Sequence, residues 1–221
     1  MPRISRVVAV GYPHHITQRG NYRQPVFMDE EDFIQYLQWL KEYCLKYSLN
    51  IWAYCLMNNH VHFVVVPMKE DSLAKTFNTL HMRYSQYFNQ KRKARGHLWQ
   101  GRFYSCILDE RHLRATVRYV ENNPLRAGVV EKPHEYNWSS ARSRVHGEAA
   151  PVLSDDFYLI KEIDDWSAYL MESDDNAMIN SIRQNTKTGR PCGDESFIKK
   201  MEGLLERKLT ALPRGRPRKR K

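Results

Sequence analysis

The chain has 221 residues, a length that fits one or two domains. Its 42% hydrophobic and 12% aromatic content is enough for a packed core, which excludes a wholly disordered chain. The formal net charge is +10, from 35 basic and 25 acidic residues, and such an excess favours polyanionic partners, with nucleic acid first.

The first half of the chain alternates between strand and helix patterns. Residues 6–10 and 14–18 are expected to be strands joined by a turn, and residues 31–47 a helix with Asp29 as its N-cap. Two further β-branched and aromatic runs, residues 51–57 and 61–66, predict a hairpin.

A second helix is expected over residues 72–89, a strand over 98–108 and a third helix over 110–122. Pro124 disfavours helical geometry in the residue before it and so ends that helix. The order predicts an α+β fold, a ferredoxin-like antiparallel sheet with helices packed on one face. A C-terminal helical and disordered extension follows, with an amphipathic helix over 197–209.

Charge divides the chain into three parts. The net charge is +7 over residues 83–118, −8 over residues 148–178 and +6 over the last nine residues, PRGRPRKRK. We therefore expect a first domain over 1–147, an acidic, partly helical segment over 148–192, and an amphipathic helix with a basic tail over 193–221.

The cysteines and the N-terminal region indicate the compartment. No Cys-x-x-Cys pair is present, which excludes zinc ribbons and thioredoxin-like motifs. Cys44, Cys55 and Cys106 lie in apolar runs and are expected to be buried free thiols, which suits a reducing compartment. Neither a signal peptide nor a run of about 20 apolar residues is recognisable. These features predict a cytoplasmic protein without a membrane partner.

His60 and His62 open the second strand of the predicted hairpin. Because side chains alternate along a strand, the two imidazoles point to one face. Neutral imidazoles at this spacing can hold one divalent ion and leave positions open for substrate oxygens. The alternative is that the pair decorates the solvent side of the hairpin. Val64 replaces the third histidine of a histidine-triad hydrolase, and the helices argue against a cupin.

The third predicted helix carries two further candidates. Leu113 and Val117 mark its core face, whereas Tyr119 and Asn123, four residues apart, lie together at the border with solvent. Asn123 could supply a third oxygen ligand, with the hydroxyl of Tyr119 near the same ion. The alternative makes Tyr119 an ordinary border tyrosine and Asn123 a helix C-cap.

Several segments match a known family in order over about residues 6–142. PHHITQRGN, CLMNNHVHFVVVP, LWQGRF, RYVENNPLRAGVV and YNWSSA resemble the single-tyrosine HUH-type transposases, and among them the REP-associated tyrosine transposases, relatives of small insertion-sequence transposases. The resemblance implies that His60, His62 and Asn123 bind the metal and that Tyr119 is the nucleophile. Some relatives have Gln at the position of Asn123.

The resemblance also implies a chemistry. A phenol is a weak nucleophile at neutral pH unless a cation assists, and Mg²⁺ or Mn²⁺ would supply that assistance at a phosphate. The expected activity is a metal-dependent single-strand DNA endonuclease and strand transferase with a 5′-phosphotyrosine intermediate, acting at DNA hairpins of REP type. The protein would be nucleoid-associated, as a monomer or a homodimer. The alternatives are a non-catalytic DNA- or RNA-binding protein on the same scaffold and a phosphodiesterase that uses water.

Basic residues mark the candidate DNA-binding surfaces, where cations follow phosphates and aromatic rings stack on bases. Trp99, beside the first group, either stacks on a base or belongs to the core. The acidic segment is expected to form a solvated helical face, and an alternative hypothesis is that it masks basic surface when DNA is absent. The candidates are a loop with Lys91, Arg92, Lys93, Arg95 and Arg102, a helix face with Arg111, Arg114 and Arg118, and an AT-hook-like tail with Arg214, Arg216 and Arg218.

Overall fold

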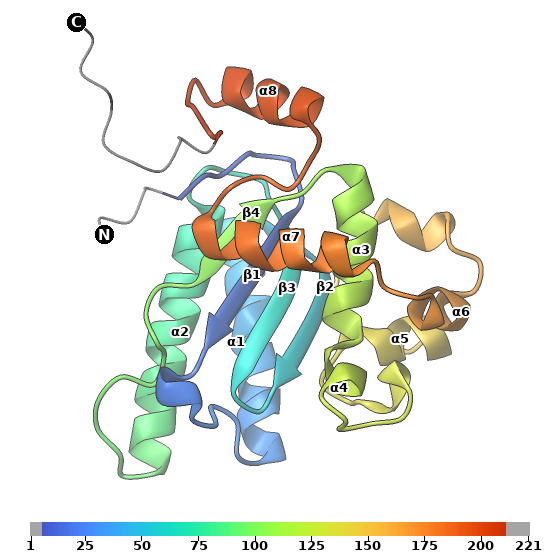
Figure 1. Cartoon of the computed structure of the whole chain (residues 1–221). Coiled ribbons are helices and arrows are strands. Elements are labelled where there is room, and N and C mark those ends of the chain that lie inside the picture. The colour runs from blue at the N-terminus through green and yellow to red at the C-terminus, as the bar shows by residue number, and fades with distance from the viewer. Residues whose placement is uncertain (1–5, 211–221) are drawn as a thin grey trace, which may run out of the picture.

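Runs of β-branched and aromatic residues form a single sheet in the structure, a computed structural model that describes residues 6–210 (Figure 1). The strand order is β2-β3-β1-β4, and every neighbouring pair is antiparallel. This arrangement confirms the predicted α+β, ferredoxin-like class. The strands are β1 (His14–Arg19), β2 (Leu49–Met57), β3 (His60–Pro67) and β4 (Tyr104–Ile107).

Two long helices, α1 (Glu30–Tyr47) and α2 (Ser72–Lys91), cover one face of this sheet. The Asp29 side chain accepts a hydrogen bond from the backbone N–H of Asp32, so the predicted N-cap is confirmed. Apolar side chains of both helices pack on the inward residues of the strands, among them Phe63 of β3. Burial of this aromatic-rich layer stabilises the first half of the chain.

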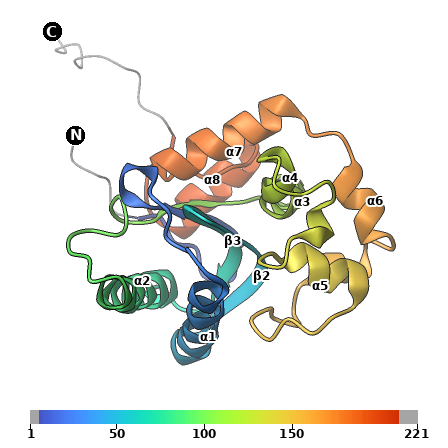
Figure 2. The same cartoon turned by 90° about the horizontal axis from the view of Figure 1, so that it is seen from below.

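The opposite face of the sheet is also covered, which corrects the expectation of helices on one face only. Helices α3 (Glu110–Glu121) and α7 (Asn176–Thr188) lie across it, on the side away from α1 and α2 (Figure 2). Trp52, Cys55 and Val64 on this face are apolar, so the strands are buried on both sides. A sheet with two apolar faces needs two covering layers.

The remaining helices belong mainly to the second half of the chain. The acidic segment, residues 148–192, contributes Phe157, Leu159 and Trp166 to the same apolar cluster as α3. None of the helices within residues 6–210 is both long and apolar enough to span a membrane. The helical elements not yet introduced are α4 (Asn123–Arg126), α5 (Ser140–His146), α6 (Trp166–Met171), α8 (Glu195–Leu204) and the 3₁₀ turns Asn21–Arg23, Pro133–Glu135 and Tyr158–Lys161.

Two predicted strands differ from the structure. Residues 6–10 form no strand; the segment instead packs by its side chains, and the Arg6 guanidinium stacks on Phe103. The strand expected over 98–108 shrinks to β4, because Leu98 and Trp99 turn into the core next to α2 and meet the sheet only through the isolated bridge between Gly20 and Trp99. The core interpretation of Trp99 is therefore the correct one; its ring N–H donates to the carbonyl of His81.

Candidate active site

The two histidines of β3 lie on the sheet face covered by α3 and α7. His62 pairs in register with Thr17 of β1, and His60 pairs with Arg19, so both imidazoles stand on this face beside β1. Their ring centroids are 5.1 Å apart. A third imidazole, that of His15, comes from β1; its Nε2 lies 2.9 Å from Nδ1 of His62.

Tyr119 projects from α3 toward these rings. Its ring centroid is 5.6 Å from that of His62 and 6.0 Å from that of His15, edge to face in both cases. Only 7% of the side chain is exposed. The helix places it there because Leu113, Val117 and Val120 hold the neighbouring face against the sheet.

Asn123 is the first residue of α4, two positions after the end of α3, and lies near His60. Helix α3 ends at Glu121, and Pro124 stands in the first turn of the short helix α4, where its missing N–H costs nothing. The Asn123 side chain lies near enough to the His60 imidazole to offset part of the lowering of its pKa. The four candidate residues span 64 positions of the sequence, and the fold of a single chain brings them together. They are His60, His62, Tyr119 and Asn123.

Burial keeps the imidazoles of this site neutral. Loss of hydration lowers the pKa of His60 to about 4, with a further contribution from the charge of Arg19. Burial lowers the pKa of His15 to about 3, and that of His62 well below its ordinary value. Neutral imidazoles keep a nitrogen lone pair free, which is what a metal ligand requires.

The donor set fits a divalent cation that keeps open positions. Within residues 6–210, no three or more His, Cys, Asp or Glu side chains are grouped to hold a metal ion. A metal site at His60 and His62 would therefore include a ligand of another type. The side chain of Asn123 carries an amide oxygen, a ligand of that other type. Two imidazoles and one amide oxygen suit Mn²⁺, and also Mg²⁺ with water in the remaining positions.

Two arginines that the sequence did not single out flank the phenol of Tyr119. The Arg126 guanidinium of α4 lies 4.2 Å from the centre of the Tyr119 ring and donates to the Tyr119 carbonyl. Arg183 of α7 approaches from another side, with Nε 3.3 Å from the phenolic oxygen. These cations can neutralise negative charge on the phenolic oxygen or on a bound phosphate.

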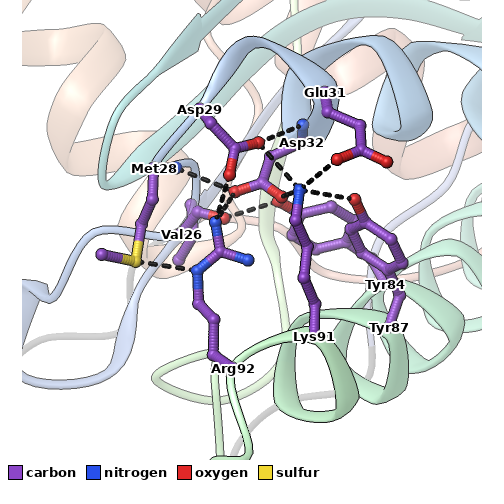
Figure 3. Close-up of polar contacts among 9 residues, drawn as sticks. All are labelled: Val26, Met28, Asp29, Glu31, Asp32, Tyr84, Tyr87, Lys91 and Arg92. Carbon is purple, nitrogen blue, oxygen red and sulfur yellow. Dashed lines mark hydrogen bonds and ion pairs between the residues drawn. The ribbon is translucent and has the colours of Figure 1, made fainter.

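Lys91 and Arg92, predicted to bind DNA, are held by acidic residues at the start of α1 (Figure 3). Lys91 Nζ lies 2.9 Å from Asp29 and 2.7 Å from Glu31, and Arg92 donates to Asp32 at 2.6 Å. The Asp32 side chain is fully buried, so it depends on these cations for its charge balance. Lys91 and Arg92 therefore join α1 to α2 rather than extending toward a ligand.

The other predicted basic residues divide into two groups. Lys93, Arg95, Arg102 and Arg111 are exposed and accessible to a phosphate backbone. Arg114 and Arg118 instead form ion pairs with the acidic segment, with Glu162 and with Glu172 and Asp174 respectively. The acidic segment thus lies on the basic face of α3 in the structure. Arg214, Arg216 and Arg218 fall outside the described residues.

Four residues near the site escaped the sequence analysis: His15, Arg126, Thr186 and Arg183. His15 stands in the quoted segment PHHITQRGN, and alternation along β1 could have marked it once the register with β3 was known. Arg126 follows the third helix by one turn. No local signal identifies Thr186 or Arg183, because their helix reaches the site only through tertiary packing.

Comparisons with known proteins place these observations in a family. The family model described as "Transposase IS200 like" matches residues 9–123. A REP-associated tyrosine transposase of Haemophilus influenzae is 25% identical over 122 residues, which are 50% of this chain and 69% of that protein. A solved structure of a REP-associated tyrosine transposase bound to a REP hairpin aligns with a TM-score of 0.53 at 18% identity, over 71% of this chain and 93% of the other. At that identity the structural likeness establishes a shared fold.

Proposed function

The chain belongs to the IS200-like transposase family, and on that premise we propose that it is a metal-dependent single-strand DNA endonuclease and strand transferase with Tyr119 as its nucleophile. The observation that carries this proposal is the position of the Tyr119 ring, 5.6 Å from that of His62 in a site that Asn123 and His60 complete.

The residues of the site divide the reaction between them. A divalent cation held by His60, His62 and Asn123 would polarise the scissile phosphate and stabilise the charge on its oxygens. The phenolic oxygen of Tyr119 attacks the phosphorus and loses its proton, and the bond from phosphorus to the 3′-oxygen breaks. That oxygen takes up a proton and leaves as a 3′-hydroxyl, while the 5′-phosphate stays on Tyr119. The covalent intermediate lets a later strand be joined without ATP.

Single-stranded DNA with a hairpin is the proposed substrate. The relative of known structure is described as bound to a REP hairpin, and the chain carries a net charge of +10. The exposed cations Lys93, Arg95 and Arg102 lie on the loop after α2 and can follow a phosphate backbone. Because Tyr119 and the proposed metal ligands come from the same chain, one copy is enough to form the site.

The test is covalent attachment to DNA. The protein is incubated with Mn²⁺ and a labelled single-stranded hairpin taken from the sequence flanking its own gene, then resolved by denaturing electrophoresis. We expect a protein–DNA adduct with the wild type and none with Tyr119→Phe, which keeps the ring and its packing. Gel-shift binding by both proteins serves as the control for folding.

Two other outcomes identify the alternatives. Binding without cleavage by the wild type favours a non-catalytic nucleic-acid-binding protein on this scaffold. Cleavage without an adduct, equally strong in Tyr119→Phe, favours a phosphodiesterase that uses water as its nucleophile. Either result overturns the role proposed for Tyr119.

A further inference from the structure

A chain of buried hydrogen bonds connects α7 to His62. Thr186 Oγ1 lies 2.7 Å from Nδ1 of His15, and the opposite nitrogen of His15 lies 2.9 Å from Nδ1 of His62. Thr186 and His15 are each 2% exposed and His62 is 6% exposed. The planes of the His15 and His62 rings are nearly parallel, with an interplanar angle of 3°.

The proton positions follow from the Thr186 hydroxyl, which has a single proton to donate. Thr186 Oγ1 donates that proton to the carbonyl of Ile182, one helical turn earlier, at 2.7 Å. With that proton donated to the carbonyl, the oxygen accepts from its two other neighbours, Cys106 Sγ at 3.2 Å and Nδ1 of His15, so the proton of a neutral His15 is on Nδ1. Nε2 of His15 is then an acceptor, and the hydrogen bond to it requires a proton on Nδ1 of His62.

We propose that Thr186 is a positioning residue that acts through His15 to hold His62 in the tautomer with its lone pair on Nε2. That nitrogen is the only one of His62 left for a cation, because Nδ1 is occupied by His15. The inference deepens the proposed function and rests on it in taking His62 as a metal ligand. Metal-binding histidines in general need such an outer partner to orient the ring and select the tautomer.

His60 obtains the same arrangement from its own hairpin. Its Nδ1 lies 2.6 Å from the side-chain oxygen of Asn59, whose amide nitrogen donates to the Arg23 carbonyl at 3.3 Å. Asn59 therefore accepts from His60 and leaves Nε2 of His60 free. The two proposed ligands thus differ in where the residue that orients each ring comes from. The partner of His60 is its neighbour in sequence, whereas the support of His62 comes from α7, beyond residues 9–123 that the family model matches.

The experiment reads the histidine tautomers of the metal-free protein by NMR with ¹⁵N-labelled histidine. In the wild type we expect a protonated Nδ1 and an unprotonated Nε2 for His62. Thr186→Val keeps the shape of the side chain but removes the acceptor, so the proton of His15 is free to move to Nε2 and His62 is expected to reverse its tautomer. Thr186→Ser, which keeps the hydroxyl, is the matched control and should retain the wild-type signals.

Calorimetric titration with Mn²⁺ is the second measurement. We expect Thr186→Val to weaken Mn²⁺ binding by about 10-fold or more, the usual cost of losing an outer partner of a metal-binding histidine, and Thr186→Ser to stay close to the wild type. Unchanged Mn²⁺ affinity and an unchanged His62 tautomer in Thr186→Val overturn the proposal.

The wild-type spectrum also tests the inference without any variant, so the result does not depend on whether Thr186→Val folds. A proton on Nε2 of His62 in the folded wild type contradicts the proposed action of Thr186 through His15. The outcome is also independent of DNA cleavage. If the protein shows the expected tautomers but forms no adduct, the proposed nucleophile is wrong and the role of Thr186 stands. If the protein forms the adduct but His62 has the opposite tautomer, the role of Thr186 is wrong and the proposed nucleophile stands.

Discussion

Nε of Arg183 on α7 lies 3.3 Å from the phenolic oxygen of Tyr119 on α3. The guanidinium also stands 5.4 Å from the centre of the Tyr119 ring, which Arg126 contacts as well. Helix α7 thus contacts the proposed nucleophile and, through Thr186 and His15, a proposed metal ligand. The C-terminal half of the chain is part of the site and not an appendage to it.

Loss of the Arg183 side chain should slow covalent attachment to DNA. A hydrogen bond from a charged donor contributes about 1.5–3 kcal/mol, so Arg183→Ala is expected to reduce the rate of adduct formation roughly 10-fold or more. Arg183→Lys keeps the charge and should be intermediate. Single-turnover kinetics on denaturing gels measure the rate. A faster reaction in Arg183→Ala contradicts this role and indicates that the contact restrains Tyr119.

The amide of Asn123 should be needed for metal binding. Asn123→Ala removes the only oxygen ligand of the proposed set, so Mn²⁺ affinity should fall by more than the roughly 10-fold typical of an outer-partner loss. Asn123→Gln retains an amide and is expected to restore part of that affinity. Isothermal titration with Mn²⁺ provides the values. Equal affinity for Asn123→Ala and wild type removes Asn123 from the ligand set.

Neutralising the acidic partners of α3 should strengthen DNA binding at low salt. Glu172→Gln combined with Asp174→Asn frees Arg118 for phosphates, and the slope of log affinity against log salt should steepen by about 0.7 per cation gained on a single strand. Asp155→Asn, an exposed change of the same kind in the same segment, is the control. Fluorescence anisotropy over a salt series gives both slopes. If the control and the double variant behave alike, the masking hypothesis is wrong.

Substitutions in the loop after α2 should affect stability at one position and DNA binding at the others. Arg92→Gln leaves the fully buried carboxylate of Asp32 with Lys91 as its remaining cation, so the free energy of unfolding should drop by about 1.5–3 kcal/mol. Lys93→Gln and Arg95→Gln change exposed side chains, and their stability should stay within about 0.5 kcal/mol of the wild type while DNA affinity falls. Urea denaturation and anisotropy measure the two properties. A stable Arg92→Gln variant with weakened DNA binding would restore Arg92 to the binding surface.

Acid should begin to destabilise the fold below about pH 6.5, before most carboxylates titrate. Burial lowers the pKa of His81 to about 3 and that of His14 to about 4, both from an ordinary value of 6.5. Between those values the unfolded chain binds more protons than the folded one, so stability is full above pH 6.5 and is lost as the pH falls toward 4. Each histidine contributes up to about 1.4 kcal/mol per pH unit in this window.

The free energy of unfolding by urea at pH 7, 6 and 5 checks this expectation. His81→Gln keeps a side chain that can form a hydrogen bond with the Tyr36 hydroxyl, and it should flatten the pH dependence because it cannot titrate. A curve that is level between pH 7 and pH 5 would falsify the assignment of buried neutral histidines.

The sequence by itself determined the features that depend on neighbours along the chain. Strand alternation puts His60 and His62 on one face. A spacing of four residues puts Asn123 about one helical turn beyond Tyr119, where α4 follows α3. The helices and the hairpin of the first 122 residues followed for the same reason.

Tertiary structure decided everything that needs two distant segments to meet. His15 reaches His62 only through the register of β1 with β3, and Thr186 and Arg183 reach the site only because α7 buries an apolar side on β4 and α3. The sequence identifies Lys91 and Arg92 as cations. It does not show that they form ion pairs with the acidic residues at the start of α1, because those residues are distant in the chain. Burial and charge pairing are summed over the whole fold, so they become visible only when the chain is packed.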